Sequence, residues 1–122
     1  MAGSVECEVA GDLATVVLDS PGKLNAIDLG MWRRLTELFR DLGRQSEIRC
    51  IVLRGEGSLA FASGGDLEEF LTQRTTLEQA RAYHDEVALA LGAIAQCGHP
   101  TVALVQGACI GGGLEIAAAC DL

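Results

Sequence analysis

The chain has 122 residues, with nine Lys or Arg, 17 Asp or Glu and a formal net charge of −8. Hydrophobic residues make up 49%, which is too many for a disordered chain, and the length suits one small domain over residues 1–122. The acidic balance argues against sequence-independent nucleic-acid binding, because such binding depends on Lys and Arg that neutralise phosphates. It does not exclude binding of a small anionic ligand, because such a ligand responds to the local electric field rather than to the net charge of the chain.

Neither a membrane span nor a targeting segment is predicted. The apolar stretch over residues 101–122 is interrupted by Gln106, Glu115 and Asp121, and the first residues lack the basic-then-apolar order of a signal peptide. The five cysteines form no Cys-x-x-Cys pair: Cys7, Cys50, Cys97, Cys109 and Cys120. We therefore expect free thiols, no metal site, no membrane contact and a cytoplasmic protein.

In chain order, the first half of the sequence predicts a hairpin, a helix and a strand. Apolar runs at residues 5–9 and 13–18 flank a turn at Ala10-Gly11-Asp12. Asp28 is placed to cap a helix that Gly43 ends, and residues 49–54 predict a buried strand. The apolar stripe of this helix is Leu29, Trp32, Leu35, Leu38, Phe39 and Leu42.

The middle of the sequence predicts a glycine-rich loop over residues 55–65 and then two helix starts. Asp66 with Glu69, and Thr76 with Gln79, have the form of capping boxes. The second start leads a helix from residue 77 to about residue 97, which Gly98-His99-Pro100 stops.

The last part predicts a buried strand over residues 101–105, a turn at Gln106-Gly107 and a helix over residues 114–119. The full order of hairpin, helix, strand, helix, strand, helix predicts an α/β domain with right-handed crossovers. Because this order stops on a helix and leaves a sheet edge exposed, it predicts part of a larger domain.

Two glycine-rich stretches that follow the two predicted strands carry the functional signal. They are Ala-Phe-Ala-Ser-Gly-Gly-Asp-Leu over residues 60–67 and Gly-Ala-Cys-Ile-Gly-Gly-Gly-Leu-Glu over residues 107–115. Glycine lets a ligand approach backbone N–H groups closely, and one N–H from each loop would bind a developing oxyanion. Glu115 follows Gly112 by one helical turn, so its carboxylate could transfer protons there. The alternative is a pair of tight turns with an electrostatically favourable Glu at a helix start.

Other motifs are weaker. Residues 55–60, Gly-Glu-Gly-Ser-Leu-Ala, fit a dinucleotide fingerprint, but a loop follows them where a helix is required. Ser63 lies outside a nucleophile elbow, and His84 and His99 lack metal-ligand spacing. Trp32 is expected in the core.

Four segments together resemble the crotonase superfamily, the enoyl-CoA hydratase/isomerase group. They are residues 23–28 (Lys-Leu-Asn-Ala-Ile-Asp), 60–67, 100–107 (Pro-Thr-Val-Ala-Leu-Val-Gln-Gly) and 111–122 (Gly-Gly-Gly-Leu-Glu-Ile-Ala-Ala-Ala-Cys-Asp-Leu), and they occur in the family's order. The resemblance spans essentially the whole chain and corresponds to the N-terminal half of a family domain. It implies the α/β class with a crotonase-like ββα superhelix, of which this chain is the N-terminal portion.

The resemblance implies an enzyme of fatty acid metabolism that hydrates or isomerises a 2-enoyl-CoA, with coenzyme A as part of the substrate and no further cofactor. The N–H groups of Ala62 and Gly112 would form an oxyanion hole for a thioester enolate, and Glu115 would hold or activate the added water. The implied substrate-binding residues are Lys23, Ala26, Ala62, Ser63, Gly64, Gly65, Asp66 and Gly112.

The resemblance also places a second catalytic glutamate and trimer-forming helices beyond Leu122, so a homo-oligomer, a trimer or a dimer of trimers, is expected. Glu115 does not separate a hydratase (a lyase) from an isomerase. A non-catalytic acyl-CoA-binding or assembly module is the alternative, because the implied second half is missing from this sequence.

Overall fold

The computed structural model describes residues 2–122 and begins with two paired strands. Strands β1 (Ser4–Ala10) and β2 (Leu13–Asp19) form the predicted antiparallel hairpin. Its turn includes Gly11 at a φ of +63°, a conformation that suits a residue without a Cβ atom. Along β2, every second side chain is fully buried: Ala14, Val16 and Leu18. The hairpin prediction is therefore confirmed.

The main sheet continues with two parallel strands in the order β1-β2-β3-β5. Strand β3 (Cys50–Gly55) pairs with β2, and β5 (Thr101–Leu104) pairs with β3. The outer edge of β5 is not wholly open, because the Ala103 N–H donates to the Leu122 carbonyl at 2.8 Å and the Leu122 N–H donates to the Thr101 carbonyl at 3.1 Å. The last residues thus lie along the edge that the sequence predicted to be exposed.

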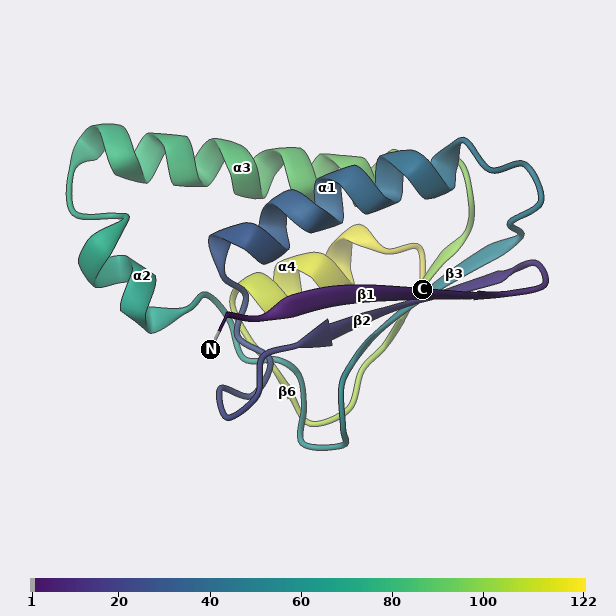
Figure 1. Cartoon of the computed structure of the whole chain (residues 1–122), viewed down its shortest axis with the longest axis horizontal. Coiled ribbons are helices and arrows are strands. Elements are labelled where there is room, and N and C mark those ends of the chain that lie inside the picture. Colours follow the sequence, from purple (N-terminus) through teal and green to yellow (C-terminus); the bar gives the residue numbers. More distant parts are fainter. Residues whose placement is uncertain (1) are drawn as a thin grey trace.

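Helices α1 (Leu29–Gly43) and α3 (Leu77–Ala95) lie side by side over one face of the sheet (Figure 1). Helix α1 begins as predicted, since the Asp28 carboxylate accepts from the Met31 N–H at 2.8 Å. It also ends at Gly43 as predicted. The next residue, Arg44, has the backbone angles of a right-handed helix, so the helix does not end with a glycine in the left-handed conformation. Helix α3 ends two residues earlier than expected. No helix within residues 2–122 has the length and apolar character needed to cross a membrane.

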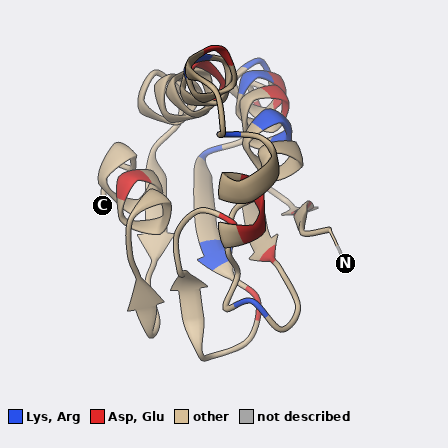
Figure 2. Ribbon diagram, turned by 90° about the vertical axis from the view of Figure 1, so that its left-hand side faces the viewer, with Lys and Arg blue, Asp and Glu red and all other residues tan. Residues whose placement is uncertain are grey.

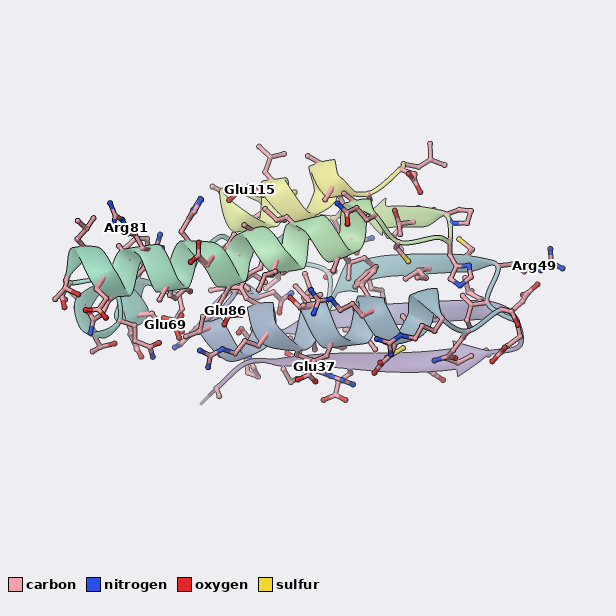
Figure 3. All side chains as sticks on the ribbon, turned by 90° about the horizontal axis from the view of Figure 1, so that it is seen from above. Glu37, Arg49, Glu69, Arg81, Glu86 and Glu115 are labelled. Atoms are coloured by element: carbon pink, nitrogen blue, oxygen red, sulfur yellow. The ribbon has the colours of Figure 1, made fainter. Side chains whose placement is uncertain are left out.

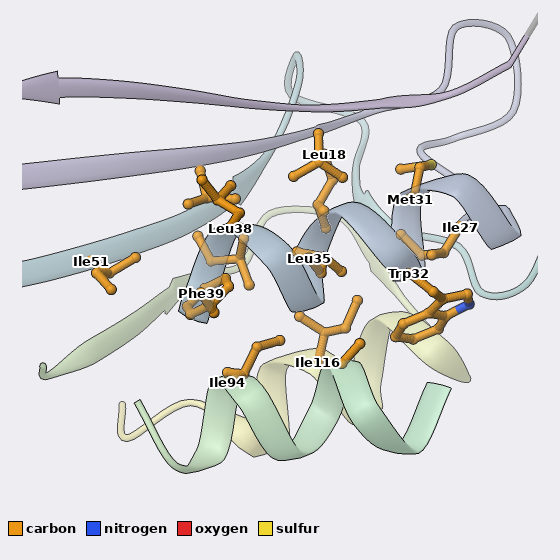
Figure 4. Close-up of a cluster of buried hydrophobic side chains, with 14 of the residues drawn as sticks. Leu18, Ile27, Met31, Trp32, Leu35, Leu38, Phe39, Ile51, Ile94 and Ile116 are labelled. Atoms are coloured by element: carbon orange, nitrogen blue, oxygen red, sulfur yellow. The ribbon is translucent and has the colours of Figure 1, made fainter. Parts of the chain in front are cut away.

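The core lies between the sheet and the helices. Leu35 of α1, Ile94 of α3 and Ile116 of α4 (Gly112–Ala119) point toward one another, and Trp32 lies in the same cluster (Figure 4). Burying each such side chain is worth about 1.5–3 kcal/mol. The predicted stripe on α1 holds except at Leu29, which is only half-buried while Met31 enters the core.

Two short strands inside the glycine-rich loops were missed. Strands β4 (Ala60–Ala62) and β6 (Ala108–Cys109) form a separate two-stranded parallel sheet. Segments this short carry no readable periodicity, and only their mutual pairing makes them strands. Helix α4 also starts earlier than predicted, at Gly112, and the short helix α2 (Leu67–Thr72) starts after Asp66 as expected.

Candidate active site

The two glycine-rich loops meet in direct backbone contact. The Ile110 N–H donates to the Ala62 carbonyl at 3.1 Å, and Ala62 pairs with Cys109 in the β4–β6 ladder. A Cβ atom added at Gly113 would lie 2.3 Å from the Ala62 carbonyl oxygen, which is closer than any real contact. Gly113 is therefore required for this close approach of the two loops.

The start of α4 rests on the single tryptophan. A Cβ atom at Gly112 would lie 2.9 Å from the Trp32 ring, and Trp32 is itself buried. Within residues 2–122 the Gly112 N–H has no hydrogen-bond acceptor, whereas the Gly113 N–H donates to the Ile110 carbonyl at 2.9 Å. An unpaired N–H at a helix start is a donor available to an anionic or carbonyl oxygen.

A turn at residues 23–27, here named the strap, is joined to the first glycine-rich loop. The Ser63 N–H and hydroxyl donate to the carbonyls of Leu24 and Lys23, both at 3.0 Å. The Ile27 N–H donates to the Gly64 carbonyl at 2.7 Å. These bonds fix the loop between the strap on one side and β6 on the other, and they commit the Ser63 hydroxyl to a backbone acceptor.

Sequence reasoning did not single out Asn25, which is the anchor of the strap. Its side chain is buried and accepts from the Ser20 N–H at 3.1 Å. Its amide nitrogen donates to the carbonyls of Glu56 at 3.1 Å and Ala60 at 2.9 Å. Its φ of +57° is a conformation that Asn tolerates better than most residues. The signal that the sequence offered is the position of Asn25 within the segment 23–28, one of the four that carry the family resemblance.

A cavity of about 570 Å³ opens where the strap, the first loop and α2 meet. Six of the predicted substrate-binding residues line it: Lys23, Ala26, Ser63, Gly64, Gly65 and Asp66. Leu67, Glu68, Phe70 and Gly111 complete the lining and were not predicted. The remaining predicted residues, Ala62, Gly112 and Glu115, do not line this cavity. Its walls combine backbone polar groups with apolar side chains, as a ligand with polar and apolar parts requires.

The charged side chains that line the cavity are those of Lys23, Asp66 and Glu68. The Lys23 ammonium lies 3.1 Å from an oxygen of Asp66 and 3.5 Å from an oxygen of Glu68. The hydrogen bond to Asp66 raises the pKa of Lys23 above its ordinary value, so the side chain stays charged at neutral pH. Asp66 also caps α2 by accepting from the Glu68 N–H at 2.9 Å. No cluster of three metal-binding side chains occurs in the described part of the chain.

Glu115 is exposed in the first turn of α4. Figure 2 shows that α4, which carries Glu115, lies apart from α2, which carries the cavity-lining Glu68. The Glu115 side chain projects from α4 on the side away from α1 (Figure 3). The fold of residues 2–122 thus brings together the two loops and the strap, but it leaves this carboxylate outside the cavity.

Comparisons with known proteins identify the family of the chain. The model of the enoyl-CoA hydratase/isomerase family matches residues 8–122. The chain is 38% identical over 112 residues to a Bacillus subtilis protein assigned by name to the enoyl-CoA hydratases/isomerases, covering 90% of this chain and 42% of that protein. It is 34% identical over 116 residues to the mouse mitochondrial Δ(3,5)-Δ(2,4)-dienoyl-CoA isomerase, covering 88% of this chain and 35% of that protein.

Solved structures show the same fold. The crystal structure of an enoyl-CoA hydratase/carnithine racemase from Magnetospirillum magneticum superposes with a TM-score of 0.94 at 41% identity, covering 98% of this chain and 46% of that one. The prediction of a mixed α/β fold that corresponds to the N-terminal portion of a family domain is therefore confirmed. The chain spans less than half the length of these relatives.

Proposed function

Since the chain belongs to the enoyl-CoA hydratase/isomerase family, we propose that it supplies the oxyanion-binding part of an acyl-CoA site. The observation that carries the proposal is the backbone contact between the two glycine-rich loops at Gly113 and Ala62, with an unpaired N–H on the adjacent Gly112. In this proposal the thioester carbonyl oxygen accepts from the Gly112 N–H, whereas Ala62, the second donor that the resemblance implies, is fully buried and paired with Cys109 in the β4–β6 ladder. One such donor is worth about 3 kcal/mol of transition-state stabilisation.

Glu115 is the proposed proton-transfer group. In hydration, its carboxylate takes a proton from water while the water oxygen bonds to C3 of the enoyl group. The electron pair of the double bond moves toward the thioester carbonyl oxygen, and the enolate then takes a proton at C2 from the Glu115 carboxylic acid, which is restored as a carboxylate. In isomerisation, the carboxylate removes a proton from one carbon and an acid returns one to another. Relatives named for each reaction match this chain, so both stay within the proposal.

The cavity beside the loops is the proposed place of the coenzyme A portion of the substrate. Lys23 offers a cation to its phosphates, the glycine backbone lies close to its chain, and Leu67 and Phe70 supply apolar contact. Coenzyme A is then part of the substrate, and no further cofactor is proposed. A homo-oligomer stays a prediction of the resemblance, and a cytoplasmic location stays a prediction from the cysteine pattern and the first residues.

Hydration of crotonyl-CoA by the purified chain tests the proposal, followed as the loss of enoyl-thioester absorbance. We expect Glu115→Gln to lower turnover about a hundredfold or more, the scale of one acid–base group, with similar acyl-CoA affinity. The matched control is Glu47→Gln, an exposed carboxylate before β3. Unchanged turnover in Glu115→Gln would remove this residue from the mechanism.

A second candidate is an acyl-CoA-binding module without turnover. The observation that favours it is the position of Glu115 outside the cavity, exposed on α4. Binding of crotonyl-CoA without any loss of absorbance would select this candidate. Absorbance loss that depends on Glu115 would exclude it.

A further inference from the structure

Helix α2 is a wall of the cavity that is poorly anchored by packing. None of its residues is buried, and Leu67 and Leu71 are 76% and 78% exposed. Leu67, Glu68 and Phe70 nevertheless form one side of the 570 Å³ cavity. The position of this wall therefore has to depend on something other than a hydrophobic core.

One side chain of α2 turns toward the body of the protein. The two carboxylate oxygens of Glu69 accept from the Leu29 N–H at 3.0 and 3.1 Å, at the first residue of α1. One of them also accepts from the hydroxyl of Tyr83 on α3 at 2.6 Å. Tyr83 is buried, so these bonds reach into the protein interior. A single carboxylate thus joins α2 to both long helices. Glu69 is labelled in Figure 3.

This arrangement differs from the capping box that the sequence predicted. In a capping box the Glu69 carboxylate would return to the Asp66 N–H, but that N–H donates to the Ile27 carbonyl at 3.0 Å. The carboxylate is thereby free for contacts outside its own helix. Arg74 adds a second, weaker link, because its guanidinium lies 4.3 Å from the centre of the Phe70 ring and 4.5 Å from that of Tyr83.

We propose that Glu69 is a positioning residue that fixes α2 as a wall of the ligand cavity by joining it to Leu29 and Tyr83. Hydrogen bonds to a charged acceptor are stronger than those between neutral groups, so this link is well suited to a helix without buried side chains. When α2 is detached, the cavity lacks Leu67, Glu68 and Phe70. The apparent affinity of any ligand of the cavity then falls in proportion to the fraction of molecules with α2 attached.

Hydrogen exchange of the ligand-free chain tests the link without reference to the proposed function. We expect Glu69→Ala to speed exchange of the Leu29 amide and the amides of residues 67–72 about tenfold or more, with β2 and β3 unchanged. Glu69→Gln keeps one acceptor oxygen and should lie between the wild type and Glu69→Ala. Equal exchange in all three proteins, or unprotected α2 amides already in the wild type, would overturn the proposal.

Tyr83 supplies a spectroscopic signature, because it is the only tyrosine in the chain. Its burial and its hydrogen bond to Glu69 raise the pKa of its hydroxyl. Tyrosinate absorbance should therefore appear at lower pH in Glu69→Ala than in the wild type, and at unchanged pH in the control Glu47→Ala. An unchanged titration in Glu69→Ala would contradict the contact.

Binding of crotonyl-CoA by calorimetry tests the consequence for the cavity, and this arm alone rests on the proposed function. We expect Glu69→Ala to weaken binding about tenfold, Glu69→Gln less, and Glu47→Ala not at all. Faster exchange with unchanged affinity would overturn the role in the cavity. If the wild type binds no crotonyl-CoA, the proposed function fails, while the exchange and titration results still decide the link.

Discussion

The strap at residues 23–27 and helix α2 are two walls of one cavity, but they are held in different ways. The strap is fixed by backbone hydrogen bonds to residues 63–66 and by the buried Asn25 amide. Helix α2 buries no residue and depends on the carboxylate of Glu69. The comparison teaches that one wall is set by backbone and buried amide hydrogen bonds and the other by a few side chains, among which Glu69 makes the hydrogen bonds to α1 and α3. Substitutions in the two regions should therefore differ strongly in cost.

The largest effect is expected for Asn25→Ala. This change leaves the Ser20 N–H and the Glu56 and Ala60 carbonyls without their present partner, and it puts Ala at a φ of +57°. We expect a loss of about 4 kcal/mol in the free energy of unfolding, measured by urea denaturation. Asn25→Gly separates the two causes, because it keeps the left-handed backbone but lacks the amide. A loss below about 1 kcal/mol would mean that the strap does not need this anchor.

The next effect is expected for Gly113→Ala, which acts on the second glycine-rich loop. The added Cβ atom would lie 2.3 Å from the Ala62 carbonyl oxygen, so α4 and β4 must separate. We expect a loss of about 3 kcal/mol by urea denaturation. The matched control is Gly92→Ala in α3, where the added methyl meets no atom within 4 Å and should stabilise the helix by about 0.5–1 kcal/mol. The same sign in both variants would contradict the close approach of the loops.

A smaller, pH-dependent effect is expected for Tyr83→Phe in the second wall. The change removes the hydroxyl bond to Glu69 and should cost about 1.5 kcal/mol at pH 7. Burial first, and then Glu69, raise the pKa of Tyr83 above its ordinary value of 10.0. The folded state therefore keeps the proton longer than the unfolded state, and this contribution is complete below pH 10 and decreases as the pH rises further. Urea denaturation at pH 7 and at higher pH should show the difference between wild type and variant shrinking; a constant difference would contradict the assignment.

The smallest effect is expected for Leu71→Gln on the exposed side of α2. Leu71 is 78% exposed and does not line the cavity. The free energy of unfolding should change by less than about 0.5 kcal/mol, with unchanged exchange of the Leu29 amide. A larger loss would show that α2 is held by packing in addition to Glu69.

Much of the fold was readable from the sequence because its signals are local. The alternation in β2, the stripe on α1 and the caps at Asp28, Asp66 and Thr76 depend on residues a few positions apart. Strands β4 and β6 were missed because each exists only through the other. The sequence predicted a capping box for Glu69. The prediction was wrong because the actual partners of Glu69 lie on α1 and α3, far along the chain.

The sequence by itself determined the order of the helices and of the main-sheet strands, the family and which loops are rich in glycine, because composition, periodicity and motifs are properties of neighbouring residues. Only the tertiary structure decided that the two loops touch, that Asn25 anchors the strap and that Glu69 holds α2. It also decided that Glu115 lies outside the cavity within residues 2–122. Contacts of this kind form when distant segments pack together, and they follow from the shape and hydrogen-bonding groups of the whole fold.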